Sequence, residues 1–131
     1  MDYIIMKYAL IVMSSPYNEE TSITAYLFAK HVIKMNHKLY SVFFFANGAL
    51  HTNMKDISTN MSCNLTSKWN KLSIKFGTKL YICINSALKM GLISHKNDQN
   101  DFFSKIGLHF KLVGLGVLVK NMQKCDRVLQ L

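Results

Sequence analysis

Short apolar runs alternate along this chain with segments whose apolar residues recur at helical spacing. The alternation predicts an α/β domain with a parallel sheet, because parallel strands need a long crossover that a helix usually supplies. Three expected strands, at 7–13, 39–45 and 79–84, are mostly apolar, as strands covered on both faces are. Two shorter strands are expected at 109–113 and 126–131.

The segments between these strands show helical periodicity. One helix is expected to start at Glu19 and Glu20 and to end at Asn36 and His37, and a second is expected to end at Gly77. A short helix should follow Cys83, and another should span 115–124. The buried positions expected on the three longer helices are Ala25, Phe28, Ala29 and Val32, then Leu65, Trp69, Leu72 and Phe76, then Leu115, Leu118, Val119 and Met122.

The predicted fold is therefore a single three-layer α/β/α domain over residues 1–131, with an open, mainly parallel sheet of about five strands. Helices should cover both faces of the sheet. The stretch 46–64 has no clear period, so it is expected to be a functional loop, a mobile loop or one that contains a short helix.

Length and composition favour a protein of the cytoplasm. A chain of 131 residues that is 50% apolar can build a real core. It holds no apolar run near the ~20 residues of a membrane span, and its start does not have the form of a signal peptide. Its cysteines, Cys63, Cys83 and Cys125, are odd in number and form no C-x-x-C pair, which disfavours a disulfide framework or a compact zinc site.

The formal charge of +9 points toward anionic partners. Its basic residues are nearly all lysines scattered along the chain, and the single arginine is Arg127. Because arginine leads in reading base edges, the charge is a weak indication of acidic partners and not a signature of sequence-specific nucleic-acid binding.

Cys83 is the main candidate for chemistry. It ends an apolar strand, and Asn85 and Ser86, two good helix caps, follow it. A thiol there is expected at the edge of the sheet where ligands bind, near the unpaired N–H groups of a helix start that stabilise a thiolate. Asn85 and Lys89 are candidates for further support of that anion. The alternatives are that Asn85 only caps the helix and that Lys89 is an ordinary surface charge. The alternative for Cys83 is a small buried hydrophobe.

The other motifs in the sequence give weaker indications of function. Gly114-Leu115-Gly116 lacks the third glycine of a dinucleotide fingerprint and follows the fourth strand, so a tight turn with close helix–sheet packing is expected there. The five histidines show no metal-binding spacing, and neither a phosphate loop nor a G-x-S-x-G motif occurs. Cys63 is expected to be a surface thiol and Cys125 a core residue. No metal or organic cofactor is predicted.

The order of these segments resembles the sulfur-relay proteins of the DsrE-like family from Met6 onward, so that 1–5 would be an N-terminal extension. The resemblance rests on an ordered set of short matches. They are Met6-Lys7-Tyr8-Ala9-Leu10-Ile11-Val12, Pro16-Tyr17, the helix at 25–29, Ser41-Val42-Phe43-Phe44-Phe45, Gly48, Asn53, Ile82-Cys83 with Ala87-Leu88 and Gly91, Gly114-Leu115-Gly116, and Cys125-Asp126-Arg127-Val128-Leu129-Gln130-Leu131.

The resemblance implies a sulfurtransferase that carries sulfur as a persulfide on Cys83 during 2-thiolation of the wobble uridine in certain tRNAs. It implies a heterohexamer with TusB-like and TusC-like subunits, two copies of each, a TusA-like donor and a TusE-like acceptor, without membrane or specific nucleic-acid contacts. Two residues depart from the family pattern: Asn18 replaces a glycine, and Met90 replaces the second residue of a basic pair. A non-catalytic assembly subunit and a basic RNA-binding module stay open as alternatives.

Overall fold

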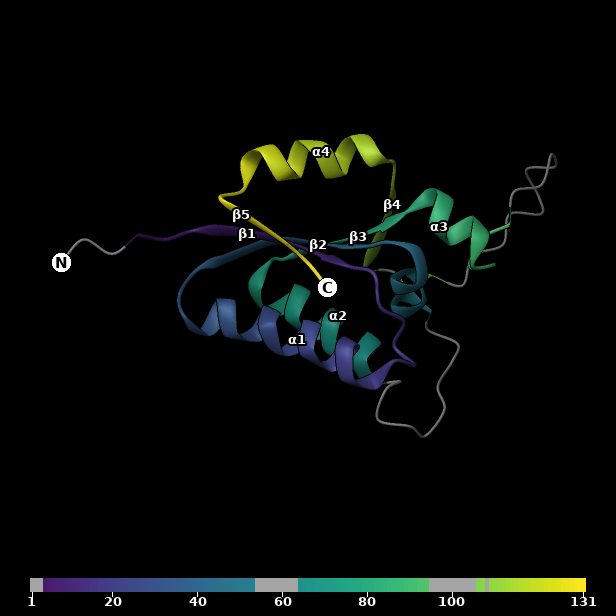
Figure 1. The fold of residues 1–131 in the computed structure, drawn as a ribbon, viewed down its shortest axis with the longest axis horizontal. Helices are drawn as coiled ribbons and strands as arrows, with labels where there is room; N and C mark the ends of the chain where they lie inside the picture. Colours follow the sequence, from purple (N-terminus) through teal and green to yellow (C-terminus); the bar gives the residue numbers. More distant parts are fainter. Residues whose placement is uncertain (1–3, 54–63, 95–105, 108) are drawn as a thin grey trace.

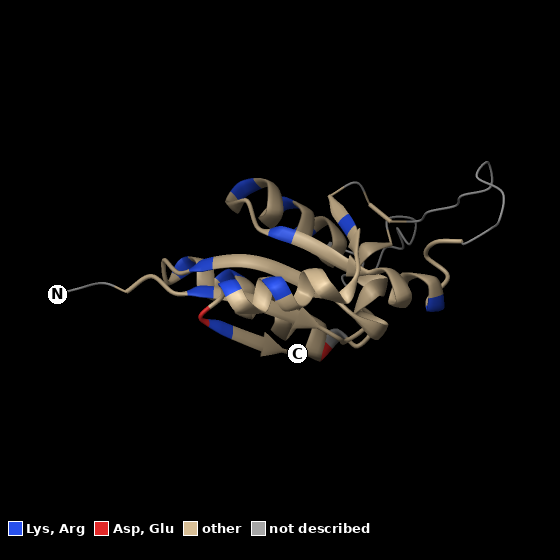
Figure 2. Cartoon of the chain, turned by 90° about the horizontal axis from the view of Figure 1, so that it is seen from above, with Lys and Arg blue, Asp and Glu red and all other residues tan. Residues whose placement is uncertain are grey.

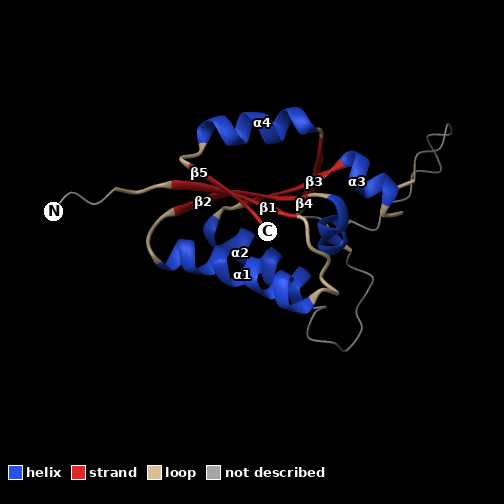
Figure 3. Ribbon diagram, viewed as in Figure 1, coloured by secondary structure: helices blue, strands red, loops and turns tan. Residues whose placement is uncertain are grey.

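Five parallel strands form one sheet. The computed structural model describes residues 4–53, 64–94, 106–107 and 109–131, and its strands lie in the order β4-β3-β2-β1-β5. Figure 3 shows the strands in red between the helices. Every strand pairing in the sheet is parallel, so the predicted open parallel sheet is confirmed. The strands are β1 Lys7–Val12, β2 Lys38–Phe44, β3 Lys79–Cys83, β4 Phe110–Val113 and β5 Arg127–Gln130.

Helices cover both faces of the sheet, as predicted. Figure 1 shows α1 and α2 on one face and α4 on the other. The connections from β1 to β2 and from β2 to β3 move along the sheet in one direction, whereas the connection from β4 to β5 runs back past β1. Because crossover connections between parallel strands are right-handed, this reversal places α4 on the face opposite to α1 and α2. The helical elements are α1 Glu19–Lys34, the 3-10 helix η1 Ala46–Thr52, α2 Asn64–Phe76, α3 Ile84–Lys89 and α4 Leu115–Lys124.

The main core lies between the sheet and the α1–α2 layer. Trp69 of α2 is fully buried there and meets the rings of Tyr26 and Phe44 edge-on, at centroid distances of 5.2 and 5.5 Å. The predicted positions on α1 and α2 are buried except for Phe28, which is half-buried, and Phe76. Phe76 was wrongly expected in the core. It is 49% exposed because α2 ends at it and Gly77, at φ 73°, turns the chain back toward β3.

The predicted buried face of α4 is wrong. Leu118 packs on the sheet together with Val117, but Leu115, Val119 and Met122 are between 41 and 51% exposed. The three exposed residues share one face of the helix. The neighbouring face, which carries Leu118, contacts the sheet. The face that contacts the sheet also includes Asn121, which is buried and donates a hydrogen bond from Nδ2 to the carbonyl oxygen of Val117 at 2.8 Å.

Close helix–sheet packing through Gly114 and Gly116 is also wrong. A Cβ placed on either glycine would meet no described atom within 4 Å. The side chains of Val117 and Leu118 make the contact with the sheet instead.

The stretch 46–64 contains a short helix, η1, which was one of its three expected forms. Positions 54–63, including Cys63, and most of the polar stretch 94–101 lie outside the described residues. No helix in the described part of the chain is long and apolar enough to cross a membrane.

Candidate functional site

The carboxyl ends of the strands, together with η1 and α3, form one edge of the molecule (Figure 1). Cys83 is the last residue of β3 and the N-cap of α3, and Val113 is its register partner on β4. Open parallel sheets bind ligands at this edge. The structure therefore places Cys83 at the junction that the sequence predicts.

The thiol of Cys83 is covered. Alternation along β3 turns Tyr81 and Cys83 toward α4, where Cys83 packs in a small apolar cluster with Phe43 and Val113. Val117 and Leu118 of α4 close this cluster, and Cys83 is only 2% exposed. The thiol thus lies at the edge of the sheet but beneath a helix, so a reaction partner reaches it only if this cover moves.

The residues after Cys83 do not cap the helix, contrary to the prediction. Because α3 begins at Ile84, Asn85 and Ser86 already lie inside its first turn. Ser86 is buried, and its Oγ accepts a hydrogen bond from the backbone N–H of Ala46 at 2.9 Å. Sequence reasoning missed this role, since no local pattern links two positions on different elements.

Asn85 and Lys89 are both exposed. Lys89 ends α3, so at 1.5 Å per residue it lies about 9 Å along the helix from Cys83. Met90 follows as the C-cap, and Gly91, at φ 71°, closes the helix as expected. Support of a Cys83 thiolate by Asn85 or Lys89 stays a prediction.

Cys125 occupies a different place, between α4 and β5, and is half-buried where a core position was expected. Burial raises the pKa of its thiol, and the carboxylate of Asp126 adds to this, against an opposite effect of Lys7 and Lys38. Its thiolate is therefore disfavoured at neutral pH.

His51 is a buried residue that sequence reasoning did not single out. Its Nε2 lies 2.9 Å from the carbonyl oxygen of Ser14, so this nitrogen carries the proton, while Nδ1 is buried with no hydrogen-bond partner in the described structure. Burial lowers the pKa of His51 to about 4, against a smaller opposite effect of the hydrogen bond to Ser14. The neutral ring ties η1 to the segment after β1. Among the described residues, no three His, Cys, Asp or Glu side chains are grouped to hold a metal ion.

Comparison with known proteins identifies the family. Residues 6–131 match the DsrE/DsrF-like family, which is nearly the whole chain. The chain belongs to the DsrE/DsrF-like family. This confirms the resemblance read from the sequence.

Within the DsrE/DsrF-like family, the chain is a homologue of the TusD sulfurtransferases. It is 38% identical over 130 residues to "Sulfurtransferase TusD" of Buchnera aphidicola subsp. Baizongia pistaciae, covering 95% of this chain and 99% of the relative. It is 31% identical over 127 residues to the protein of that name from Proteus mirabilis, covering 95% of this chain and 98% of that one.

A solved structure supports the fold. The crystal structure of the ychN protein from E. coli superposes with a TM-score of 0.75, covering 97% of this chain and all of that one. Sequence identity is only 12%, so this likeness concerns the fold alone.

Proposed function

We propose that this chain is a sulfurtransferase that carries one sulfur atom as a persulfide on Cys83. The observation that carries the proposal is the position of Cys83, at the carboxyl end of β3 and the start of α3, in a homologue of TusD sulfurtransferases. Cys125 is the other described thiol, and its raised pKa suits it poorly to nucleophilic attack.

The chemistry is two successive displacements at sulfur. The Cys83 thiolate attacks the outer sulfur of a cysteine persulfide on the donor, a new S–S bond forms, and the donor's inner sulfur leaves as a thiolate. An acceptor thiolate then attacks the outer sulfur of the Cys83 persulfide and releases Cys83 as a thiolate. Electrons balance in each step without an added oxidant, reductant or cofactor.

The surroundings of Cys83 suit a sulfur in transit. Val117 and Leu118 exclude water from the thiol, which protects a persulfide from oxidation and hydrolysis. The first-turn N–H groups of α3 follow Cys83 directly, although its thiol makes no capping hydrogen bond to them. In the proposed reaction, Asn85 and Lys89 add weaker support from the exposed side of α3.

The proposed pathway rests on the similarity to TusD sulfurtransferases. The proposed donor is TusA-like, the acceptor is TusE-like, and the end product is 2-thiolated wobble uridine in tRNA. The proposed assembly is a cytoplasmic heterohexamer with TusB-like and TusC-like subunits, two copies of each. What supports these assignments is the identity of 31 to 38% to the relatives cited above.

The test is persulfide mapping by mass spectrometry. After incubation with a persulfide-loaded donor protein, the peptide that contains Cys83 should gain the mass of one sulfur atom. Cys83→Ser should fold and fail to gain it, whereas Cys125→Ser, a matched control, should load normally. Loading that survives Cys83→Ser would end the assignment.

The burial of Cys83 favours one alternative, a non-catalytic assembly subunit in which the thiol only fills the core. The same mapping separates the two functions. A structural thiol would stay unloaded even in the complex with the TusB-like and TusC-like subunits, while a relay thiol would load there.

A further inference from the structure

Every strand of the sheet carries a cation at or next to its amino end. Lys7, Lys38 and Lys79 open β1, β2 and β3, Lys111 is the second residue of β4, and Arg127 opens β5. Because all five strands are parallel and adjacent, these side chains collect at the edge opposite to Cys83. Blue segments gather at this end of the sheet in Figure 2, and red ones are sparse.

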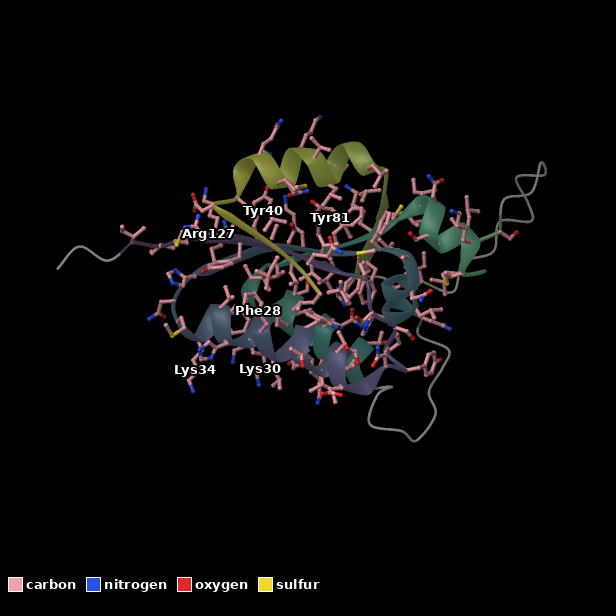
Figure 4. All side chains as sticks on the ribbon, viewed as in Figure 1. Phe28, Lys30, Lys34, Tyr40, Tyr81 and Arg127 are labelled. Atoms are coloured by element: carbon pink, nitrogen blue, oxygen red, sulfur yellow. The ribbon has the colours of Figure 1, made fainter. Side chains whose placement is uncertain are left out.

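Four of these cations form one continuous lysine row on the α4 side of the sheet. Lys111 and Lys79 line the same open hollow of about 370 Å³ with Tyr81. The ammonium groups of Lys79 and Lys38 both lie over the ring of Tyr40, at 5.2 and 5.5 Å from its centroid. Figure 4 places Tyr40 and Tyr81 between the sheet and α4. Lys7 is the register partner of Lys38, and both act on Cys125. We define Lys7, Lys38, Lys79 and Lys111 as the lysine row.

Among the residues that the structure describes, little negative charge lies near this row. All four lysines are exposed. Asp126 lies at the Lys7 end, where its Oδ2 accepts a hydrogen bond from the backbone N–H of Lys7 at 2.8 Å. The charge is therefore concentrated on Lys38, Lys79 and Lys111. With strands about 4.8 Å apart, the row places four charges on a line about 15 Å long.

We propose that the lysine row binds the phosphate backbone of a nucleic acid without reading its bases. A nucleic-acid strand is a linear polyanion, and its phosphates match a line of closely spaced ammonium groups. Lysine supplies point charges suited to phosphate, and no base-reading arginine lies within the row. The hollow beside Lys79 and Lys111 adds His109 as a further polar group for a phosphate.

A nucleic acid fits this face better than an acidic protein does. Protein–protein interfaces are poor in lysine and have an apolar centre. Of the large apolar side chains exposed in the described structure, Ile5 and Phe76 line a hollow with Lys38, at the border of the row and not at its centre. Nucleic-acid interfaces are instead polar and strongly positive. This proposal does not depend on the chemistry of Cys83, which lies at the other end of β3.

The test is fluorescence anisotropy of the full chain with a labelled 12-nucleotide oligouridylate at several salt concentrations. Contact with four phosphates predicts a slope of log K against log salt of about −3, since each contact in a single strand contributes about −0.7. The double variant Lys79→Gln/Lys111→Gln should reduce the size of that slope by about 1.4 and should weaken binding equally for oligouridylate and oligoadenylate.

A matched control removes the same charge elsewhere. Lys30 and Lys34 lie on α1, across the sheet, and point away from it in Figure 4. Lys30→Gln/Lys34→Gln should leave the slope unchanged. An equal loss in both double variants would show an effect of net charge alone and would overturn the proposal. Displacement of the RNA by an oligoglutamate of equal charge at equal concentration would also overturn it, in favour of an acidic protein. Persulfide loading of Cys83 should be normal in both variants.

Discussion

The hydroxyl oxygen of Ser86 accepts a hydrogen bond from the backbone N–H of Ala46 at 2.9 Å. Ser86 lies in α3, three residues after the candidate thiol, and Ala46 opens η1 after β2. Ala46 has φ 54°, a left-handed conformation that is unfavourable for a residue with a Cβ. One buried hydroxyl therefore joins two elements at the edge of the sheet where Cys83 lies and satisfies the N–H of a strained residue.

Ser86→Ala should destabilise the protein by about 1 to 3 kcal/mol, because the N–H of Ala46 would lose its partner. Urea denaturation measures the change. Site-resolved alkylation should also show faster modification of Cys83, since the start of α3 is then held less firmly. A control at the same contact has the opposite sign: Ala46→Gly relieves the left-handed strain and should be neutral or stabilising. Destabilisation by Ala46→Gly would contradict this account.

Gly48→Ala should be strongly destabilising, by about 3 kcal/mol. A Cβ at this position would lie 1.9 Å from the carbonyl oxygen of Val12, so the backbone of η1 or of β1 would have to shift. Thermal unfolding measures the effect as a fall in Tm of roughly 10 °C.

The matched control for Gly48→Ala is Gly116→Ala in α4. No described atom lies within 4 Å of a Cβ there, and alanine favours a helix by up to about 1 kcal/mol over glycine. The same chemical change should thus lower Tm at position 48 and raise it slightly at position 116. A similar fall at both positions would contradict the close approach to Val12.

Leu118→Ala should expose Cys83. Leu118 packs over the cluster that contains the thiol, so its truncation lowers the free energy of local opening. A loss of about 1.4 kcal/mol corresponds to a roughly tenfold faster alkylation of Cys83, measured by mass mapping with iodoacetamide. Met122→Ala serves as control because Met122 is 41% exposed on another side of α4. Equal rates in wild type and Leu118→Ala would show that α4 does not limit access.

Acid should weaken the fold through His51. Its pKa is about 4 in the folded protein and near 6.5 when exposed, so below pH 6.5 the unfolded chain takes up a proton that the folded chain does not. Stability should therefore fall from pH 6.5 to about pH 4, by about 3 kcal/mol in total from this residue, and change little above pH 6.5. Urea denaturation at pH 7.5 and 5 should show about 2 kcal/mol of this loss.

The control for the pH effect is a second histidine. His51→Asn should flatten the dependence between pH 6.5 and 4, at the cost of lower stability at neutral pH. His31→Asn, on the exposed side of α1, should leave the dependence as in wild type. An unchanged pH slope in His51→Asn would rule out the buried imidazole as its origin.

The sequence alone predicted the strands, the helices between them, and the position of Cys83 at a strand end. These are local properties. Apolar runs such as β1, helical spacing such as that of Ala25, Ala29 and Val32, and terminators such as Gly77 act within a few residues of each other. The quoted motifs also sufficed for the family, which the comparisons confirm.

The tertiary structure decided what lies next to what. The sequence shows apolar residues on several sides of α4, but it does not show that Leu118 faces the sheet while Leu115 does not. Which residues face the sheet depends on the rotation of the helix about its own axis when it packs there. The contact of Ser86 with Ala46, the burial of His51 and the lysine row likewise join positions that are distant in the chain. Local sequence patterns do not predict such pairs, since only the packing of the whole chain brings them together.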